Sequence, residues 1–120
     1  MSQATAALQA APHEQRVESA ESGGEQQMCA IGRGLMSRPT RLMIDEVSLG
    51  LAPCAVKKLS EALLAINRSG LTILLVEQVV FTAFELTRTG VVLETGRVGF
   101  AGTSSDLADA PRVRAAYRDI

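Results

Sequence analysis

Two adjacent carboxylates follow a short apolar run near the middle of the chain. The run is Leu42-Met43-Ile44, and Asp45 and Glu46 come directly after it. Such a run is typical of a fully buried parallel strand, and α/β sheets bind ligands at the carboxyl ends of these strands. Asp45 could hold a Mg²⁺-bound water there, and Glu46 could orient or deprotonate an attacking water. Two solvated acids at a strand end are an equally good interpretation of these residues taken alone.

A second polar segment stands at the start of a predicted helix. Residues 22–27 read Ser-Gly-Gly-Glu-Gln-Gln, in which Ser22 and Glu25 form a capping-box pattern. The two glycines let a ligand approach the backbone, and the first amides of the helix, together with its dipole, favour an anion. A well-capped helix without any ligand is the alternative interpretation.

A third polar group follows a second apolar run. Leu71 to Val76 is rich in Ile, Leu and Val, and it leads into Glu77 and Gln78. The side-chain amide of Gln78 could donate a hydrogen bond to a phosphate oxygen. A polar residue at a strand end is ordinary, so this signal is weak by itself.

The remaining pattern predicts the elements that position these residues. In chain order we expect a helix over 22–37, a strand over 42–44, a helix from Pro53 to Gly70, a strand over 71–76, a short helix around 81–86 closed near Gly90, a hairpin over 91–101 turning at Gly96, and a helix from Pro111. This alternation is that of an α/β fold. Two hydrophobic parallel strands need neighbours and cover on both faces, so we expect part of a larger sheet. Residues 1–20 contain few large apolar side chains and are expected to be poorly ordered.

Composition excludes several classes of function. The chain has 120 residues, of which 47% are hydrophobic and 21% charged, so a single small globular domain is expected rather than wholesale disorder. A net charge of −1 with only two lysines argues against a nucleic-acid partner. No apolar run approaches the roughly 20 residues of a membrane span, so direct membrane insertion is not expected. Cys29 and Cys54 match no zinc pattern, and we predict buried thiols in a reducing cytosol.

Taken together, in this order and spacing, the three polar segments resemble the nucleotide-binding domain of ABC transporters. Residues 22–27 look like the signature motif of that family, residues 42–46 like its Walker B strand, and Ser48-Leu49-Gly50-Leu51 falls where its D-loop lies. The resemblance is greatest to ATP-binding subunits of branched-chain amino acid importers. Its matching stretches are Gly-Glu-Gln-Gln-Met (24–28), Ala-Ile-Gly-Arg (30–33), Ser-Leu-Gly-Leu-Ala-Pro (48–53), Thr-Ile-Leu-Leu-Val-Glu-Gln (72–78) and Val-Leu-Glu-Thr-Gly-Arg-Val (92–98).

The resemblance implies a P-loop NTPase fold and a role for each segment. Glu46 and Gln78 would be catalytic, with Gln78 at the position of the switch histidine, and Asp45 would bind Mg²⁺ through water. The signature residues Ser22, Gly23, Gly24, Glu25 and Gln26 would contact ATP held by a second ATPase subunit. Permease subunits would tie the protein to the cytoplasmic face of the plasma membrane.

The chain also departs from this family. A phosphate loop, or Walker A motif, reads Gly-x-x-x-x-Gly-Lys-Ser/Thr, and here neither Lys57 nor Lys58 follows a glycine. Residues 21–120 therefore look like the C-terminal part of the domain, and we expect negligible ATP affinity of the isolated chain. Glu21 stands where an apolar residue is usual, Val47 where proline is usual, and Val79 where the nearest subfamily has asparagine.

Three functions remain open on the sequence alone. The first is an ATPase subunit of an amino-acid importer that needs its phosphate loop from elsewhere. The second is a non-catalytic module that docks on a complete ATPase and supplies Ser22-Gly23-Gly24 in trans. The third, a DNA-repair or chromosome-organising ATPase, is disfavoured by the low basic content and by the 48–53 stretch.

Overall fold

A computed structural model of the chain describes residues 23–118. The predictions for residues 1–20, and for Glu21 and Ser22, lie outside the described residues. The chain divides into two compact units between Val76 and Glu77. We refer to the described residues 23–76 as the first unit and to 77–118 as the second unit.

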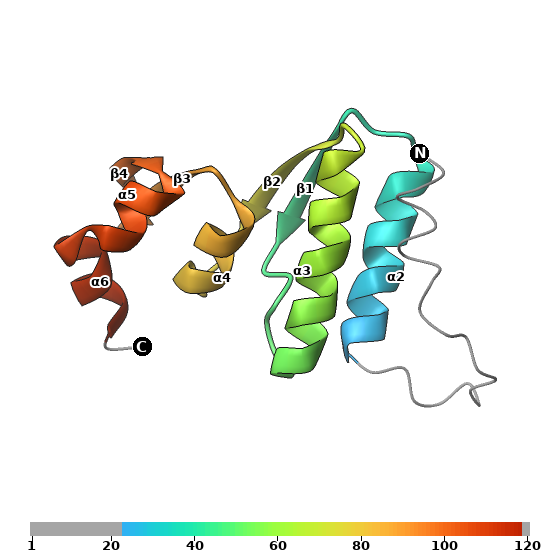
Figure 1. Ribbon diagram of the computed structural model, residues 1–120, viewed down its shortest axis with the longest axis horizontal. Helices are drawn as coiled ribbons and strands as arrows, with labels where there is room; N and C mark the ends of the chain where they lie inside the picture. The colour runs from blue at the N-terminus through green and yellow to red at the C-terminus, as the bar shows by residue number, and fades with distance from the viewer. Residues whose placement is uncertain (1–22, 119–120) are drawn as a thin grey trace. The chain divides into compact units, whose positions relative to one another are not determined.

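The first unit holds two helices and a pair of parallel strands (Figure 1). Its elements are α2 (Gly23–Met36), β1 (Arg41–Asp45), α3 (Pro53–Arg68) and β2 (Thr72–Val76). The strands pair in register from Arg41 opposite Thr72 to Asp45 opposite Val76. Helices α2 and α3 lie side by side in the first unit, and α3 runs along the strand pair. The predicted α/β alternation is confirmed, and Asp45 closes β1 at its carboxyl end.

Helix α3 begins at Pro53, as the sequence predicts, and ends at Arg68, two residues before the predicted end at Gly70. Pro53 occupies its first turn, where a missing amide proton has no effect on the helical hydrogen bonds. Its buried residues recur at steps of three and four and are Leu59, Ala62, Leu63 and Ile66. The chain leaves the helix through Gly70, whose φ of 105° suits glycine.

The strand pair is buried on one face only, which corrects the prediction of fully buried strands. Leu42 and Ile44 in β1, like Ile73 and Leu75 in β2, are half-buried. The alternate residues form the open face of the strand pair: Met43 is 78% exposed, Leu74 57% and Val76 52%. Side chains alternate between the faces of a strand, so α3 can cover only one of them. The prediction failed because the described residues of the first unit supply no cover for the other face.

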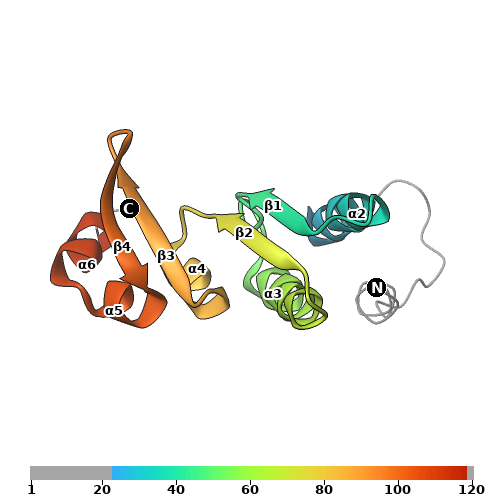
Figure 2. The same ribbon diagram turned by 90° about the horizontal axis from the view of Figure 1, so that it is seen from above.

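The second unit is built around an antiparallel hairpin (Figure 2). Its elements are α4 (Val80–Leu86), β3 (Thr89–Glu94), β4 (Arg97–Thr103), α5 (Ser104–Asp109) and α6 (Pro111–Arg118). Thr95 and Gly96 form the turn with φ values of 49° and 75°, as a two-residue hairpin connection of the primed type requires. The predicted turn at Gly96 and the predicted helix from Pro111 are confirmed.

One boundary and one helix in the second unit differ from the prediction. Gly90 lies inside β3 and does not close α4, which ends at Leu86. Helix α5 was not predicted, although Thr103 caps it: the Thr103 hydroxyl accepts a hydrogen bond from the Asp106 amide at 3.2 Å. Its six residues are too few to show helical periodicity.

Packing of the hairpin against these helices forms a local core. Val92, Leu107 and Val113 are buried together, and Phe84, Phe100 and Tyr117 are among the half-buried side chains packed against them. At the edge of this core the hydroxyls of Thr87 and Ser104 lie 2.9 Å apart in a hydrogen bond. The buried Ser104 therefore keeps a partner, as a buried polar group must.

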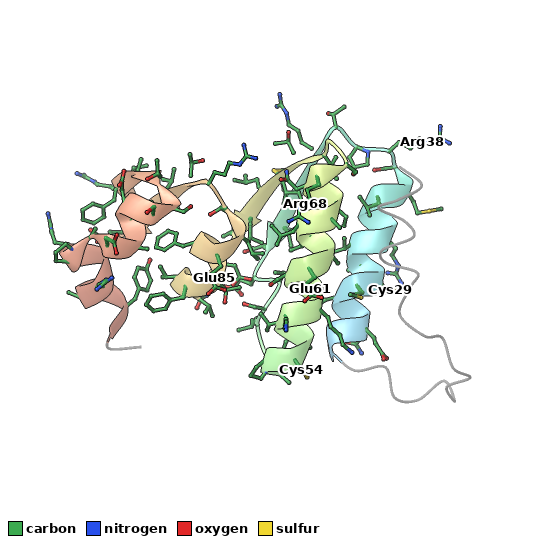
Figure 3. All side chains as sticks on the ribbon, viewed as in Figure 1. Cys29, Arg38, Cys54, Glu61, Arg68 and Glu85 are labelled. Atoms are coloured by element: carbon green, nitrogen blue, oxygen red, sulfur yellow. The ribbon has the colours of Figure 1, made fainter. Side chains whose placement is uncertain are left out.

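The two cysteines are free, as predicted, but they are exposed rather than buried. Figure 3 labels Cys29 on α2 and Cys54 at the start of α3. A helix turns by about 100° per residue. Cys29, two positions before the buried Ile31, and Cys54, five before the buried Leu59, therefore lie well away from the buried faces.

Candidate functional site

The backbone of Glu46 departs from the strand that precedes it. Directly after β1, Glu46 has a φ of 49°, in the left-handed region that a non-glycine residue seldom occupies. Its amide donates a hydrogen bond of 2.8 Å to the carbonyl oxygen of Val76, the last residue of β2. This bond ties Glu46 to the end of the neighbouring strand. A conformation of this kind costs on the order of 1–3 kcal/mol, and it persists only where surrounding structure enforces it.

A tight loop after Glu46 supplies that enforcement. The Leu49 amide donates to the Glu46 carbonyl oxygen at 3.2 Å, and the Leu51 amide donates to the Ser48 carbonyl oxygen at 3.1 Å. Val47 is 3% exposed and anchors the turn in the apolar interior. Sequence reasoning treated Val47 only as a replacement for proline. The signal that could have found this anchor is a single apolar residue between two acids and a polar Ser-Leu-Gly loop.

Asp45 lies on the open face of the strand pair. It is exposed, and it shares that face with Met43 and with Val76, its register partner. Among residues 23–118 no group of three or more His, Cys, Asp and Glu side chains could hold a metal by itself. Mg²⁺ does not require such a cage, because it is usually held by one or two carboxylates together with substrate phosphates and water. The exposed carboxylate of Asp45 fits that kind of site.

The start of α2 contacts the loop that follows Glu46. Helix α2 begins at Gly23, and a Cβ placed on Gly23 would lie 3.0 Å from Cδ2 of Leu51. A larger residue at position 23 would therefore push on this leucine. Gly24 and Glu25 are half-buried in the first turn, whereas Gln26 is exposed. The described part of the predicted signature segment thus lies against the segment predicted to be the D-loop, a contact that the sequence did not reveal.

Gln78 belongs to the second unit. It is exposed and stands two residues after Val76, just before α4 begins at Val80. The structure therefore places Asp45 and Glu46 next to each other at the end of β1 and the start of α2 against Leu51, and Gln78 follows β2 along the chain.

A separate hollow of about 480 Å³ lies in the second unit. Its lining comes from α4, α5 and the adjoining segments and consists of Phe81, Phe84, Glu85, Thr87, Arg88, Thr103, Ser104, Ser105 and Ala108. None of the predicted site residues lines it.

Comparison with known proteins finds similarity to ATP-binding proteins of transport systems. It is 48% identical over 96 residues to the high-affinity branched-chain amino acid transport ATP-binding protein BraG of Pseudomonas aeruginosa, a match that covers 80% of this chain and 41% of that protein. It is 38% identical over 89 residues to the probable branched-chain amino acid transport ATP-binding protein LivF of Archaeoglobus fulgidus, covering 73% and 38%. The chain thus spans about two fifths of the length of these relatives. No family model matches it.

A solved structure agrees on the fold. The ADP conformation of an ATP-binding cassette of an ABC transporter matches with a TM-score of 0.81 and 22% identity, over 99% of this chain and 50% of that one. The chain belongs to the family of ABC transporter ATP-binding domains and corresponds to part of such a domain. Within residues 23–118 no helix has the length and apolar character needed to cross a membrane.

Proposed function

We propose that this chain supplies the carboxylate and signature portion of an ATP-hydrolysing subunit of an ABC importer for branched-chain amino acids. One observation carries the proposal: Glu46 is held in a left-handed conformation at the carboxyl end of β1, with its amide bonded to Val76. Strain retained beside a strand end is characteristic of functional positions. The names of the two relatives support the substrate class.

In this proposal each residue has one task. Glu46 orients the water that attacks the γ-phosphate of ATP and accepts its proton. Asp45 would hold Mg²⁺, and the ion would supply positive charge that neutralises the phosphate oxygens. Gln78 donates a hydrogen bond to the γ-phosphate.

The signature segment serves a different nucleotide. Ser22, Gly23, Gly24, Glu25 and Gln26 bind the ATP held by a second ATPase subunit, because amides at a helix start favour phosphate. Permease subunits connect the ATPase pair to the cytoplasmic side of the membrane.

A chimaeric protein tests the catalytic role. The amino-terminal portion of the P. aeruginosa relative, up to the start of its match, is joined ahead of residue 21 of this chain. We expect ATP hydrolysis by the chimaera to fall about 10²- to 10⁴-fold on Glu46→Gln, the usual range for loss of a general base. Glu61→Gln, at an exposed position on α3, is the matched control and should leave the rate unchanged. Equal rates for the two variants would contradict the role of Glu46.

The same chimaera tests the substrate class. It should restore leucine uptake to a P. aeruginosa strain that lacks the relative, and the Glu46→Gln form should not. ATP hydrolysis without restored uptake would support the catalytic role but contradict branched-chain amino acids as the transported substrates.

A second candidate rests on the start of α2, where Gly23 and Gly24 open the helix. The signature segment needs no phosphate loop in its own chain, so the protein could dock on a complete ATPase and supply Ser22-Gly23-Gly24 alone. Co-purification with an intact subunit, lost on Ser22→Ala, together with full activity of the Glu46→Gln form, would select this candidate.

A further inference from the structure

The open hollow in the second unit carries two opposite charges that do not pair with each other. Glu85 on α4, labelled in Figure 3, and Arg88, two residues after that helix, both line it. A spacing of three positions would let them pair if α4 continued, but α4 ends at Leu86 and Thr87 is extended, with a φ of −124° and a ψ of 154°. Among residues 23–118 neither side chain belongs to an ion pair. A ligand that carries both charges would therefore satisfy both groups.

Hydrogen bonds fix the polar part of the hollow. The Thr87 hydroxyl donates to the carbonyl oxygen of Ala83 at 2.7 Å, so the proton in its 2.9 Å bond with Ser104 comes from Ser104. The Ser104 amide donates to the carbonyl oxygen of Arg88 at 2.9 Å, which ties the backbone of Arg88 to the start of α5. The Ser104 hydroxyl oxygen keeps only acceptor capacity. An ammonium group can donate to such an oxygen, whereas an anion gains nothing from it.

Apolar side chains form another part of the lining. Phe81, Phe84 and Ala108 belong to it, and they also line a smaller hollow of about 200 Å³ in the same unit. Phe81 is 65% exposed, so a ligand lying against its ring removes apolar surface from water. The volume of about 480 Å³ is within the range of small-molecule sites, roughly 300–1,000 Å³. The hollow thus combines one cation, one anion and an aromatic wall at the scale of a small molecule.

We infer that this hollow binds a free α-amino acid with an apolar side chain. The carboxylate of the ligand pairs with Arg88, its ammonium group pairs with Glu85, and its side chain lies against Phe81 and Phe84. A carboxylic acid or an amine alone leaves one of the two charges unpaired, and a nucleotide would bring its phosphates next to Glu85. The inference does not rest on the proposed function, because this binding needs neither ATP nor a transport partner.

Titration of the complete 120-residue chain with L-leucine tests the inference, with two-dimensional amide NMR as the measurement. We expect saturable shifts confined to residues 81–88 and 103–108, which carry the hollow. L-Aspartate has a charged side chain and should bind at least about tenfold more weakly. Shifts that do not saturate, shifts confined to other residues, or equal binding of aspartate would each overturn the inference.

Two analogues of leucine test the charged groups one at a time. Leucinamide lacks the carboxylate and 4-methylpentanoate lacks the amine, so each should bind about three- to tenfold more weakly than leucine. On Arg88→Gln the difference between leucine and leucinamide should disappear. On Glu85→Gln the difference between leucine and 4-methylpentanoate should disappear. Differences that persist in these variants would contradict the assigned pairs.

Matched variants outside the hollow complete the test. Arg97→Gln and Glu61→Gln make the same changes at exposed positions that do not line it, and they should leave the affinity for leucine unchanged. Phe81→Ala should weaken leucine binding about threefold or more, and the dispersion of the amide spectrum reports whether each variant is folded. Equal affinities of the Arg88→Gln and Arg97→Gln variants would overturn the inference.

Discussion

The two units solve the same packing problem in different ways. The second unit closes a hairpin with the two-residue turn at Thr95 and Gly96 and packs Val92 against residues within 21 positions, Leu107 and Val113, in one local core. The first unit joins parallel strands through α3 and leaves Met43 and Leu74 uncovered. An antiparallel pair tolerates one face toward water, but a parallel pair does not. The chemistry-bearing carboxylates therefore lie in the unit that depends more on further protein.

The two units are alike in one respect, because the hairpin also exposes apolar side chains. Val91, Leu93 and Val98 are all more than 60% exposed on one side of β3 and β4. The difference lies in connection: the strands of the hairpin need only a tight turn, whereas β1 and β2 need a crossover helix. Because β3 and β4 are close in the sequence, the second unit forms its sheet from adjacent segments.

The largest expected effect is a loss of stability in the first unit that leaves the second unit unchanged. Ile66 has no exposed surface, and Ile66→Ala should lower the free energy of unfolding of the first unit by about 2–5 kcal/mol. Amide hydrogen exchange should show faster exchange in α3 and β2 while Val92 and its neighbours keep their protection. Met36→Ala is the exposed control. Equal loss of protection in both units would show that they unfold as one.

A substitution in the hairpin turn provides the reverse test. Gly96 has a φ of 75° with open space around its Cα, so Gly96→Ala introduces backbone strain but no clash. We expect a loss of about 1–2 kcal/mol, confined to the second unit. Gly32→Ala, inside α2 with equally open space, is the control and should be neutral or stabilising. Loss of protection in α3 on Gly96→Ala would break the distinction between the units.

The smallest expected effects concern helix caps. Helix α5 is capped by Thr103, whereas α3 begins after Ala52 without a side-chain cap. Thr103→Ala should destabilise the second unit by about 1 kcal/mol, and Ala52→Ser should stabilise the first by a similar amount. Urea denaturation, followed separately in each unit, checks the signs of the two changes in the free energy of unfolding. A stabilising Thr103→Ala would mean that the Thr103–Asp106 hydrogen bond does not favour the folded state.

The parts of the fold that the sequence predicts are those that depend on local pattern. Leu59, Leu63 and Ile66 mark α3 by their spacing, and Gly96 marks the hairpin by its conformational freedom. Helix α5 was missed because six residues show no period, and Gly90 misled because glycine is tolerated inside a strand as well as at a helix end.

The strand-end position of the candidate site residues was predictable, but their backbone geometry was not. An apolar run followed by two acids places Asp45 and Glu46 at a strand end. No pattern reveals that Glu46 adopts a left-handed backbone, since glutamate seldom does so, nor that Gly23 lies against Leu51. The sequence indicated part of a larger sheet, but it could not show which face of the strands α3 leaves open, because burial of a strand depends on whatever packs on it.

The left-handed backbone at Glu46 also has an evolutionary consequence. Single-nucleotide changes of a glutamate codon reach glycine and aspartate, both of which occupy this conformation more readily. Mutational drift without selection for hydrolysis should therefore replace Glu46 with residues that relax the backbone. Sequencing of natural variants of this gene would measure that drift, and position 46 would report whether catalysis is still under selection.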